Sequence, residues 1–306
     1  MRGFFLAIFC CFIACQQIPP KPEFHELIGD NRVKEILCPF ELQYLDGLAW
    51  GPDQSLYFSD VAAGRIYRYK PGNGFSIVCD STEGVNGMMF DHSGNLVVCQ
   101  GKYGYLARFA PGSCIQDTLA TAYGGERFNS PNDLVVDGHN GVYFTDPSFT
   151  PDHHFQTKEA VYYITPENEI RALINDIHPD GIALSLDSKI LYLADRKEPF
   201  IWAFDVLDRG RLFNRRILYH LKDTESKEGE IRTATGMTID VKGNLFLCTH
   251  SGIIILDAHG RYLGKISMDA HPANCAFGGT NLNILYITAS NSLYQIKTNT
   301  NGRSLS

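Results

Sequence analysis

Asn129–Pro147 reads NSPNDLVVDGHNGVYFTDP and contains one complete unit of a pattern that recurs through most of the chain. Within it, the apolar run Leu134–Val136 is followed by a turn with two glycines and by a second apolar run, Val142–Thr145. Two such runs joined by a glycine-containing turn are typical of a β-hairpin. The stretch therefore predicts two antiparallel strands, preceded by the polar pair Asn132 and Asp133.

Five further copies of this unit are found along the sequence. They are DGLAWGPDQSLYFSD from Asp46, NGMMFDHSGNLVVCQ from Asn86, DGIALSLDSKILYLAD from Asp180, TGMTIDVKGNLFLCTH from Thr235 and NCAFGGTNLNILYITA from Asn274. Successive copies start 40, 46, 48, 55 and 39 residues apart, and each ends 14 or 15 residues after its start. Strand repeats with a period near 40 are typical of β-propeller blades. The sequence thus predicts an all-β fold, a six-bladed β-propeller.

The two ends of the repeat region are expected to close the ring. Val33–Leu37 is an extra strand before the first copy, whereas the sixth copy runs out soon after the strand Ser292–Lys297. Because an edge strand exposes unpaired backbone groups, we expect these two strands to pair in blade six. The prediction is a single propeller domain over residues 33–300.

The N-terminus, MRGFFLAIFCCFIAC, has the features of a targeting signal. The apolar run Phe4–Ala14 has 11 residues, too few to span a membrane, and Phe12–Cys15 resembles the lipobox of bacterial lipoproteins. We expect a signal peptide over residues 1–14, a lipid on Cys15 and a tether over residues 15–32. This would hold the protein at a bacterial cell envelope, facing the periplasm or the exterior. An ordinary secretory signal is the alternative.

Composition excludes some partners. The formal net charge is −7 and the chain has no run of Lys or Arg, which argues against binding to nucleic acid. No stretch reaches the roughly 18 apolar residues that span a membrane, so membrane contact is expected only through the lipid anchor. We expect a monomer.

Six cysteines follow Cys15: Cys38, Cys79, Cys99, Cys114, Cys248 and Cys275. Their spacings match no zinc pattern, and their possible pairings cannot be chosen from the sequence. Four of them, Cys79, Cys99, Cys248 and Cys275, lie inside apolar strand patterns. We expect these four to be buried free thiols that act as small hydrophobic groups.

The residue that starts each copy is polar in all six cases. These start residues are Asp46, Asn86, Asn132, Asp180, Thr235 and Asn274. The first strand of each propeller blade lines the central channel, so the six side chains are expected to converge at its mouth. Two carboxylates, three amides and a hydroxyl form an all-oxygen donor set, which suits Ca²⁺ best, with Mg²⁺, Mn²⁺ or Zn²⁺ as alternatives. Taken singly, each is better explained as a turn residue, but their coincidence at equivalent positions in six repeats favours a site.

Two connections are longer than a hairpin requires. Phe149–Glu159 lies inside blade three, and Lys222–Arg232 lies between blades four and five. Long loops on a rigid repeat scaffold often carry substrate contacts.

The chain from about Tyr44 to Lys297 resembles the family of gluconolactonase, senescence marker protein and luciferin-regenerating enzyme. The resemblance lies in four motifs: NSPNDLVVD…GVYFTDP from Asn129, DGIALSLDSKILYLAD from Asp180, IWAFDV from Ile201 and NCAFGG…ILYITASNSLYQI from Asn274. It implies a six-bladed propeller that holds one divalent metal at the channel mouth and hydrolyses sugar lactones. The resemblance also implies relatives that act on organophosphates.

The resemblance also implies a ligand set: Glu in blade one, Asn in blades three and four, and Asp in blade five. The metal positions here are Asp46, Asn132, Asp180 and Thr235, of which only Asn132 matches. The formal ligand charge is nevertheless −2 in both sets. The family's Asp in blade five is also the general base, and a Thr hydroxyl cannot take that role at neutral pH. Asp180, Asp46 or His250 is therefore the expected substitute.

Asn86, Asn274 and Arg127 are expected to contact the substrate, Arg127 through a carboxylate or hydroxyl group. The leading hypothesis is an envelope-anchored, metal-dependent hydrolase of a sugar lactone or related ester. Two alternatives stay open. One is a catalytically impaired propeller that binds a sugar acid or a protein partner. The other is a phosphotriester hydrolase that uses the same metal site.

Overall fold

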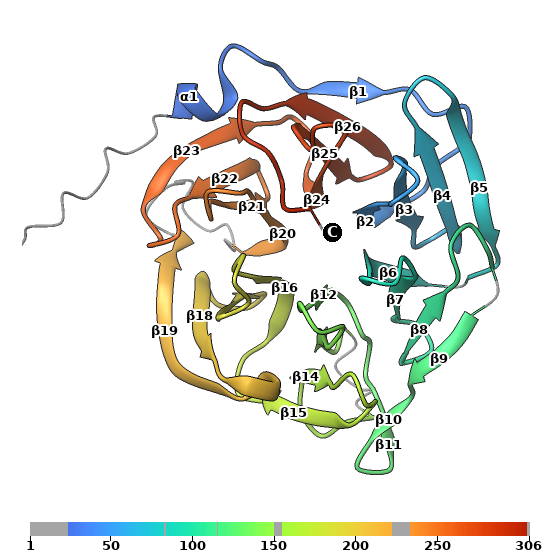
Figure 1. The fold of residues 1–306 in the computed structure, drawn as a ribbon, viewed down its shortest axis with the longest axis vertical. Coiled ribbons are helices and arrows are strands. Elements are labelled where there is room, and N and C mark those ends of the chain that lie inside the picture. Colours follow the sequence, from blue (N-terminus) through green and yellow to red (C-terminus); the bar gives the residue numbers. More distant parts are fainter. Residues whose placement is uncertain (1–23, 83, 115, 150–154, 222–232, 305–306) are drawn as a thin grey trace, which may run out of the picture.

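Each sequence repeat forms the two inner strands of one antiparallel sheet, and six such four-stranded sheets stand around a central channel (Figure 1). The prediction of an all-β, six-bladed propeller is confirmed. The structure, a computed structural model, describes residues 24–82, 84–114, 116–149, 155–221 and 233–304.

The blades follow the order of the chain. Blade one contains β2 (Leu45–Trp50), β3 (Leu56–Asp60), β4 (Arg65–Lys70) and β5 (Gly74–Asp80). Blade two contains β6 (Val85–Phe90), β7 (Leu96–Gln100), β8 (Tyr105–Phe109) and β9 (Gln116–Ala120). Blade three contains β12 (Leu134–Val136), β13 (Val142–Asp146), β14 (Ala160–Ile164) and β15 (Ile170–Ile174).

Blade four contains β16 (Pro179–Leu184), β17 (Ile190–Asp195), β18 (Phe200–Val206) and β19 (Leu212–His220), with the 3₁₀ turn η1 (Asp208–Gly210) before β19. Blade five contains β20 (Ala234–Ile239), β21 (Leu245–Thr249), β22 (Gly252–Leu256) and β23 (Tyr262–Ser267). Blade six contains β24 (Pro272–Gly278), β25 (Ile284–Ala289) and β26 (Ser292–Lys297). A small hairpin, β10 (Ala122–Tyr123) with β11 (Glu126–Arg127), joins blades two and three.

The second strand of each blade is largely buried on both faces because neighbouring blades cover both sides. All five residues of β7, β13 and β21 are buried, for example. Between blades five and six, Phe246 and Ile255 pack in one cluster with Phe277 and Ile287. Outer strands such as β19 are largely exposed or half-buried. The core is therefore a ring of apolar layers between blades, which fixes the channel geometry.

The ring closes through the N-terminal strand, as predicted. β1 (Lys34–Ile36) pairs antiparallel with β26, so that Lys34 faces Gln295 and Ile36 faces Leu293. Blade six therefore contains strands from both ends of the propeller domain (Figure 1).

Part of the predicted tether is folded instead. Helix α1 (Phe24–Ile28) lies beside β23, and its Leu27 and Ile28 side chains are buried in the cluster between blades five and six. The segment is folded rather than extended because its two adjacent apolar residues pack on a hydrophobic surface of the propeller. The predicted signal peptide and Cys15 lie outside the described residues.

The cysteine prediction is wrong at one position. Cys79 is buried on β5 but forms a disulfide with Cys114, which lies after β8 in blade two. Cys99, Cys248 and Cys275 are buried free thiols, as expected. The disulfide joins two outer edges of neighbouring blades, and an apolar strand pattern does not reveal a partner that lies in a loop.

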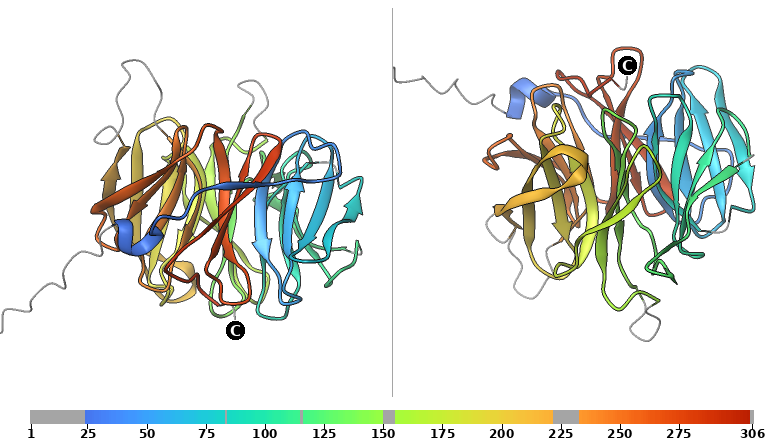
Figure 2. Two further views of the ribbon diagram at one scale, coloured as in Figure 1. Left: turned by 90° about the horizontal axis from the view of Figure 1, so that it is seen from above. Right: turned by 60° about the horizontal axis from the view of Figure 1, so that its bottom comes forward.

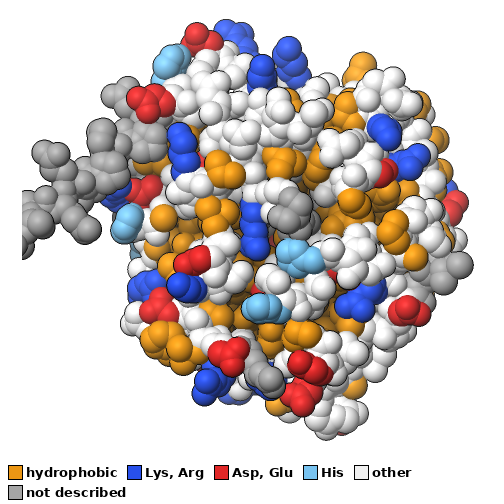
Figure 3. All heavy atoms as spheres, in the orientation of Figure 1, with side chains coloured by type: hydrophobic (Ala, Val, Ile, Leu, Met, Phe, Trp, Pro, Cys, Tyr) orange, Lys and Arg blue, Asp and Glu red, His pale blue; other side chains and the backbone are white. Residues whose placement is uncertain are grey.

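The two faces of the ring differ. The start residues line one pocket, whereas Arg303 and Ser304 line another with residues at the far ends of the first strands, such as Trp50 and Phe90. Figure 2 shows the C-terminus on one face of the ring. The C-terminal face carries acidic and basic side chains interspersed around its rim (Figure 3). At that end the channel is lined mainly by apolar residues, together with Arg303 and Ser304. Within the described part of the chain, no helix has the length and apolar character to cross a membrane.

Candidate active site

The structure brings all six start residues together. They line a single pocket of about 640 Å³ at the mouth of the channel. Asn132 and Asn274 are buried there, whereas Asp46 and Asp180 keep part of their surface open to the pocket. We call the layer formed by these residues the floor of the mouth pocket.

The local backbone explains why these side chains converge. In five blades, the pairing between the first and second strands shifts register at or beside the start residue, for example between Leu45 and Leu48 and between Pro179 and Ile182. A bulge of this kind releases one residue from the ladder and turns its side chain. The start residues therefore leave the strand pattern and face the channel axis.

Glycine after the start residue lets the blades approach closely. A Cβ atom on Gly181 would lie 1.8 Å from the carbonyl oxygen of Thr235 in the next blade. A Cβ atom on Gly47 would lie 2.1 Å from the carbonyl oxygen of Asn86. Only glycine fits where another backbone comes this near. The pairs of start residue and glycine seen in the sequence thus set the width of the floor.

Side-chain hydrogen bonds connect the floor across blades two, three and four. The Asn86 side-chain amide donates to the amide oxygen of Asn132. Asn132 in turn donates from its Nδ2 to Oδ1 of Asp180 at 2.7 Å. The Asn274 side chain hydrogen-bonds to the carboxylates of Asp46 and Asp133. The amides therefore separate the carboxylates and orient them.

Asp133 belongs to the floor but was not predicted as a site residue. It occupies the position that holds glycine in blades one, two, four and five, and it is 8% exposed. Its carboxylate accepts hydrogen bonds from the backbone N–H groups of Leu134 (3.0 Å) and Ile182 (3.3 Å). A carboxylate where four of the six copies have glycine is the sequence signal that would have found it.

Three floor carboxyl groups have raised pKa values. Burial is the main cause for Asp46, whose pKa lies well above its usual value, and the negative charges of Asp133 and Asp180 add to it. Burial raises the pKa of Asp133 to about 7, against the opposing backbone hydrogen bonds. Burial and then the charge of Asp133 raise the pKa of Asp180 to about 7, although nearby Arg196 opposes this. These carboxyl groups are therefore harder to ionise than in water, and a bound cation would favour their ionised forms.

Thr235 lines the pocket, but its hydroxyl is engaged elsewhere. Its Oγ1 donates to the carbonyl oxygen of Ala273 at 2.7 Å, at the start of blade six. This side of the floor therefore presents a neutral group that is tied to the backbone.

The residues present fit a hard divalent cation in their chemistry. The floor offers carboxylate and amide oxygens, and its carboxyl groups repel one another. Among the described residues, no group of three or more His, Cys, Asp or Glu side chains is arranged to hold a metal ion. The interleaved amides account for this, because Asn132 and Asn274 stand between the carboxylates. The site thus fits as a mixed carboxylate and amide set.

Two residues predicted to act at the site do not line the pocket. Arg127 donates to the backbone oxygens of Phe128 and Lys102 and stacks on Phe155, with its Cζ 3.8 Å from the ring centroid. The apolar and carbonyl groups beside β11 hold it there. His250 follows β21, and its ring stacks on His271 with centroids 3.7 Å apart. Neither residue is placed to contact a substrate on the floor.

Aspartates that end the second strands organise the loops of the mouth. Asp60 accepts hydrogen bonds from the backbone N–H groups of Gln43, Tyr44 and Ala63. Asp146 does the same for Asn129 and Ser130. An aspartate at the end of a strand is expected to accept hydrogen bonds from backbone N–H groups of nearby loops in this way.

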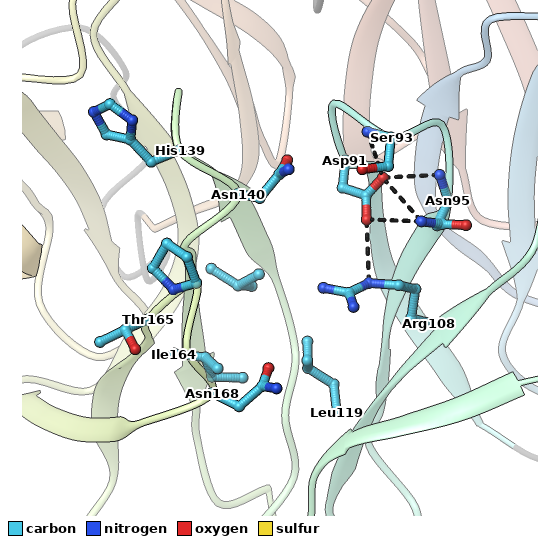
Figure 4. A pocket seen from close by; sticks show the side chains of 12 residues that line it. Asp91, Ser93, Asn95, Arg108, Leu119, His139, Asn140, Ile164, Thr165 and Asn168 are labelled. Atoms are coloured by element: carbon cyan, nitrogen blue, oxygen red, sulfur yellow. Dashed lines mark hydrogen bonds and ion pairs between the residues drawn. The ribbon is translucent and has the colours of Figure 1, made fainter.

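A smaller pocket of about 220 Å³ lies between blades two and three (Figure 4). Its Arg108 forms an ion pair with Asp91, Nε to Oδ2 at 3.1 Å, and Asp91 also accepts from the backbone N–H groups of Ser93 and Asn95. These charges satisfy one another, so the mouth pocket is the better candidate for an active site.

The fold and the mouth pocket define a six-bladed propeller with a polar-floored pocket on its axis. The family model described as SMP-30/Gluconolactonase/LRE-like region matches residues 46–291, and the chain belongs to this family. The resemblance seen in the sequence motifs is thereby confirmed.

Individual relatives agree with this assignment. The chain is 29% identical to a gluconolactonase of Zymomonas mobilis over 287 residues, covering 86% of this chain and 80% of that protein. It is 28% identical to human regucalcin over 255 residues, covering 76% and 78% of the two chains. The solved structure of a gluconolactonase from Xanthomonas campestris matches with a TM-score of 0.80 and 26% identity, over 90% of this chain and 91% of that one. Similarity to gluconolactonases supports a hydrolase of the lactonase type.

Proposed function

We propose that the protein hydrolyses a lactone at the mouth pocket with the help of one divalent cation, Ca²⁺ in the first instance. The observation that carries this proposal is the convergence of Asp46, Asn132 and Asp180 on one floor. These three residues would hold the cation. The family's gluconolactonases and a calcium-binding regucalcin of Agrobacterium tumefaciens, which shares the fold with a TM-score of 0.74, are consistent with it.

A bound cation would supply a Lewis acid that polarises the lactone carbonyl and offsets negative charge. The chain's own groups do the rest. Asp180 or Asp46 takes a proton from the attacking water, since both carboxylates open into the pocket. Asn86 and Asn274 present amide groups to the substrate from the same floor.

The test is hydrolysis of a lactone panel by protein stripped with a chelator and then reloaded with Ca²⁺, Mn²⁺, Mg²⁺ or Zn²⁺. We expect glucono-δ-lactone hydrolysis to disappear on stripping and to return with Ca²⁺. Undiminished hydrolysis by the stripped protein would contradict metal dependence.

A binding propeller is the second candidate, and Thr235 favours it. The hydroxyl that replaces the family's acid donates to Ala273 and takes no proton. Calorimetric binding of Ca²⁺ without hydrolysis of any lactone or phosphotriester would make this candidate the better one.

We also propose that the protein acts as a monomer anchored to a bacterial envelope through Cys15. One chain completes the whole floor, and the sequence before α1 has the features of a lipoprotein signal. Cys15→Ala should abolish lipid attachment and release the protein from membranes. A mature N-terminus other than Cys15, measured by mass spectrometry, would contradict the anchor.

A further inference from the structure

Above its floor, the wall of the mouth pocket is largely apolar. Tyr44 and Phe149 line it with side chains that are 48% and 55% exposed, and the turn Val61–Ala63 adds small apolar groups. Among the described residues that line the pocket above the floor, Lys102 is the only one with a charged side chain. Large exposed aromatic groups at a pocket entrance indicate contact with an apolar part of a ligand.

Tyr44 and the Val61–Ala63 turn are held as one unit. Asp60 accepts from the backbone N–H of Tyr44 (3.1 Å) and from that of Ala63 (3.0 Å). Val61 also donates to the carbonyl oxygen of Tyr44 at 2.8 Å. Tyr44 lines the same pocket as the floor carboxylates Asp46 and Asp180.

A second group of contacts holds Phe149 in place from blade four. Arg196, directly after β17, lies with its Cζ 5.5 Å from the centroid of the Phe149 ring. Its Nη2 donates to the carbonyl oxygen of Ser148 at 2.7 Å and to the carboxylate of Glu159. His178 Nδ1 lies 3.2 Å from the same carboxylate. Because Glu159 is only 7% exposed, this ion pair is shielded from water and keeps the guanidinium in one orientation.

We propose that Phe149 and Tyr44 form an apolar clamp over the part of the substrate that does not react, so that the pocket prefers lactones bearing an alkyl or aryl substituent to fully hydroxylated ones. The inference rests on the proposed lactonase function and narrows its substrate class. Hydroxyl groups placed against Phe149 or Val61 would lose their water without gaining a partner, which is unfavourable. An alkyl or aryl group would instead bury apolar surface at the same place.

Kinetics with a homologous series of substrates test the clamp. The substrates are δ-valerolactone, its derivatives with methyl, propyl and pentyl groups beside the ring oxygen, and glucono-δ-lactone. We expect kcat/KM to rise with chain length, by up to about fourfold for each methylene that is fully buried. In Phe149→Ala this rise should nearly vanish, and in Phe149→Leu most of it should persist. Phe149→Ala should lower kcat/KM for the pentyl lactone far more than for the unsubstituted lactone.

Phe155→Ala is the matched control. Phe155 is also an exposed phenylalanine, 43% accessible, that stacks against an arginine, but it does not line the pocket. Its replacement should leave the whole series unchanged.

Arg196 is a positioning residue in this scheme, and Arg196→Lys tests that role. Lysine keeps the positive charge near Asp180 but loses the contact of the guanidinium with the Phe149 ring and its hydrogen bonds to Ser148 and Glu159. We expect KM for the pentyl lactone to rise severalfold while KM for δ-valerolactone stays the same. A purely structural defect would affect both substrates equally.

Binding of lactams, which are not hydrolysed, separates this inference from the proposed function. Calorimetry would compare δ-valerolactam with its 6-pentyl derivative on the wild type and on Phe149→Ala. Tighter binding of the pentyl compound that depends on Phe149 supports the clamp, even if no lactone is hydrolysed and the proposed function fails. A flat substrate series, together with lactam affinities that depend neither on the pentyl group nor on Phe149, would overturn it.

Discussion

The floor of the mouth pocket has two unlike sides built on the same backbone. In blades three and four, Asn132 donates to Asp180, and both side chains face the channel. In blade five, Thr235 stands at the equivalent position but donates to the Ala273 carbonyl. Both Asp180 and Thr235 are followed by glycine and lie at a register shift. The backbone therefore provides equivalent positions, and the side chain alone decides whether each becomes charged or neutral.

The largest expected effect is loss of cation binding when the charged side is removed. Asp46→Ala or Asp180→Ala should weaken Ca²⁺ binding by roughly 100-fold or more, because each removes one carboxylate and leaves amide donors without an acceptor. Isothermal titration measures this. Asp80→Ala is the control, since Asp80 is an exposed partner of Arg65 on β5. Equal affinity in all variants would place the cation elsewhere.

Replacing the glycines that follow Asp180 and Thr235 should also have unequal effects on stability, though smaller ones. Gly181→Ala would press a Cβ atom onto the Thr235 carbonyl oxygen at 1.8 Å, whereas Gly236→Ala meets a side chain rather than backbone, that of Asn274 at 2.2 Å. We expect losses of about 3 kcal/mol and about 1 kcal/mol in unfolding free energy, respectively. Denaturant titration tests the order, and equal losses would show that the floor is not held by backbone contact.

Moving a carboxylate from position 180 to position 235 tests the two sides of the floor directly. Thr235→Asp alone adds a carboxylate beside others that already repel one another, and it loses the hydrogen bond to Ala273. With Asp180→Asn in the same chain, the formal ligand charge returns to −2. We expect the double variant to hydrolyse lactones about 10- to 100-fold faster than the wild type, while the single variant gains nothing. If the wild type is already active and the double variant is no faster, another residue already serves as the general base.

The smallest effect concerns pH and the metal-free protein. Folding raises the pKa of Asp133 and of Asp180 to about 7. Stability that comes from holding these protons is complete below about pH 4 and is lost as the pH rises through about 7. With a chelator present, the melting temperature of the wild type should therefore fall between pH 5 and pH 8, by roughly 2–4 °C more than that of Asp180→Asn. Calorimetric scans at the two pH values measure this, and equal falls would contradict the prediction.

The sequence predicted the blades because each inner strand is a short apolar run between turn residues. Even the pairing of β1 with β26 followed from counting strands at the two ends. The start residues were found for the same reason, since their position relative to the strands repeats. Periodic features are visible in a single sequence whenever the same local environment recurs.

Features that occur once were missed. Asp133 contacts Ile182 in the next blade, and this depends on how two blades meet rather than on either repeat. The Cys79–Cys114 disulfide likewise joins a strand to a loop of another blade. The position of Arg127 was missed for the same reason, because its stacking on Phe155 depends on a loop contact. The predicted loop 222–232 lies outside the described residues.

The closing strand has a consequence for the order in which the chain folds. β1 lies near the start of the propeller domain, whereas its partner β26 is separated from it by most of the chain. Blades one to five are each complete in sequence and are free to form their own hydrogen bonds before the ring closes. Until blade six forms, β1 has an unpaired edge, and two of its three residues, Lys34 and Glu35, are charged and exposed. Charged residues on an unpaired strand disfavour pairing with other unfolded chains.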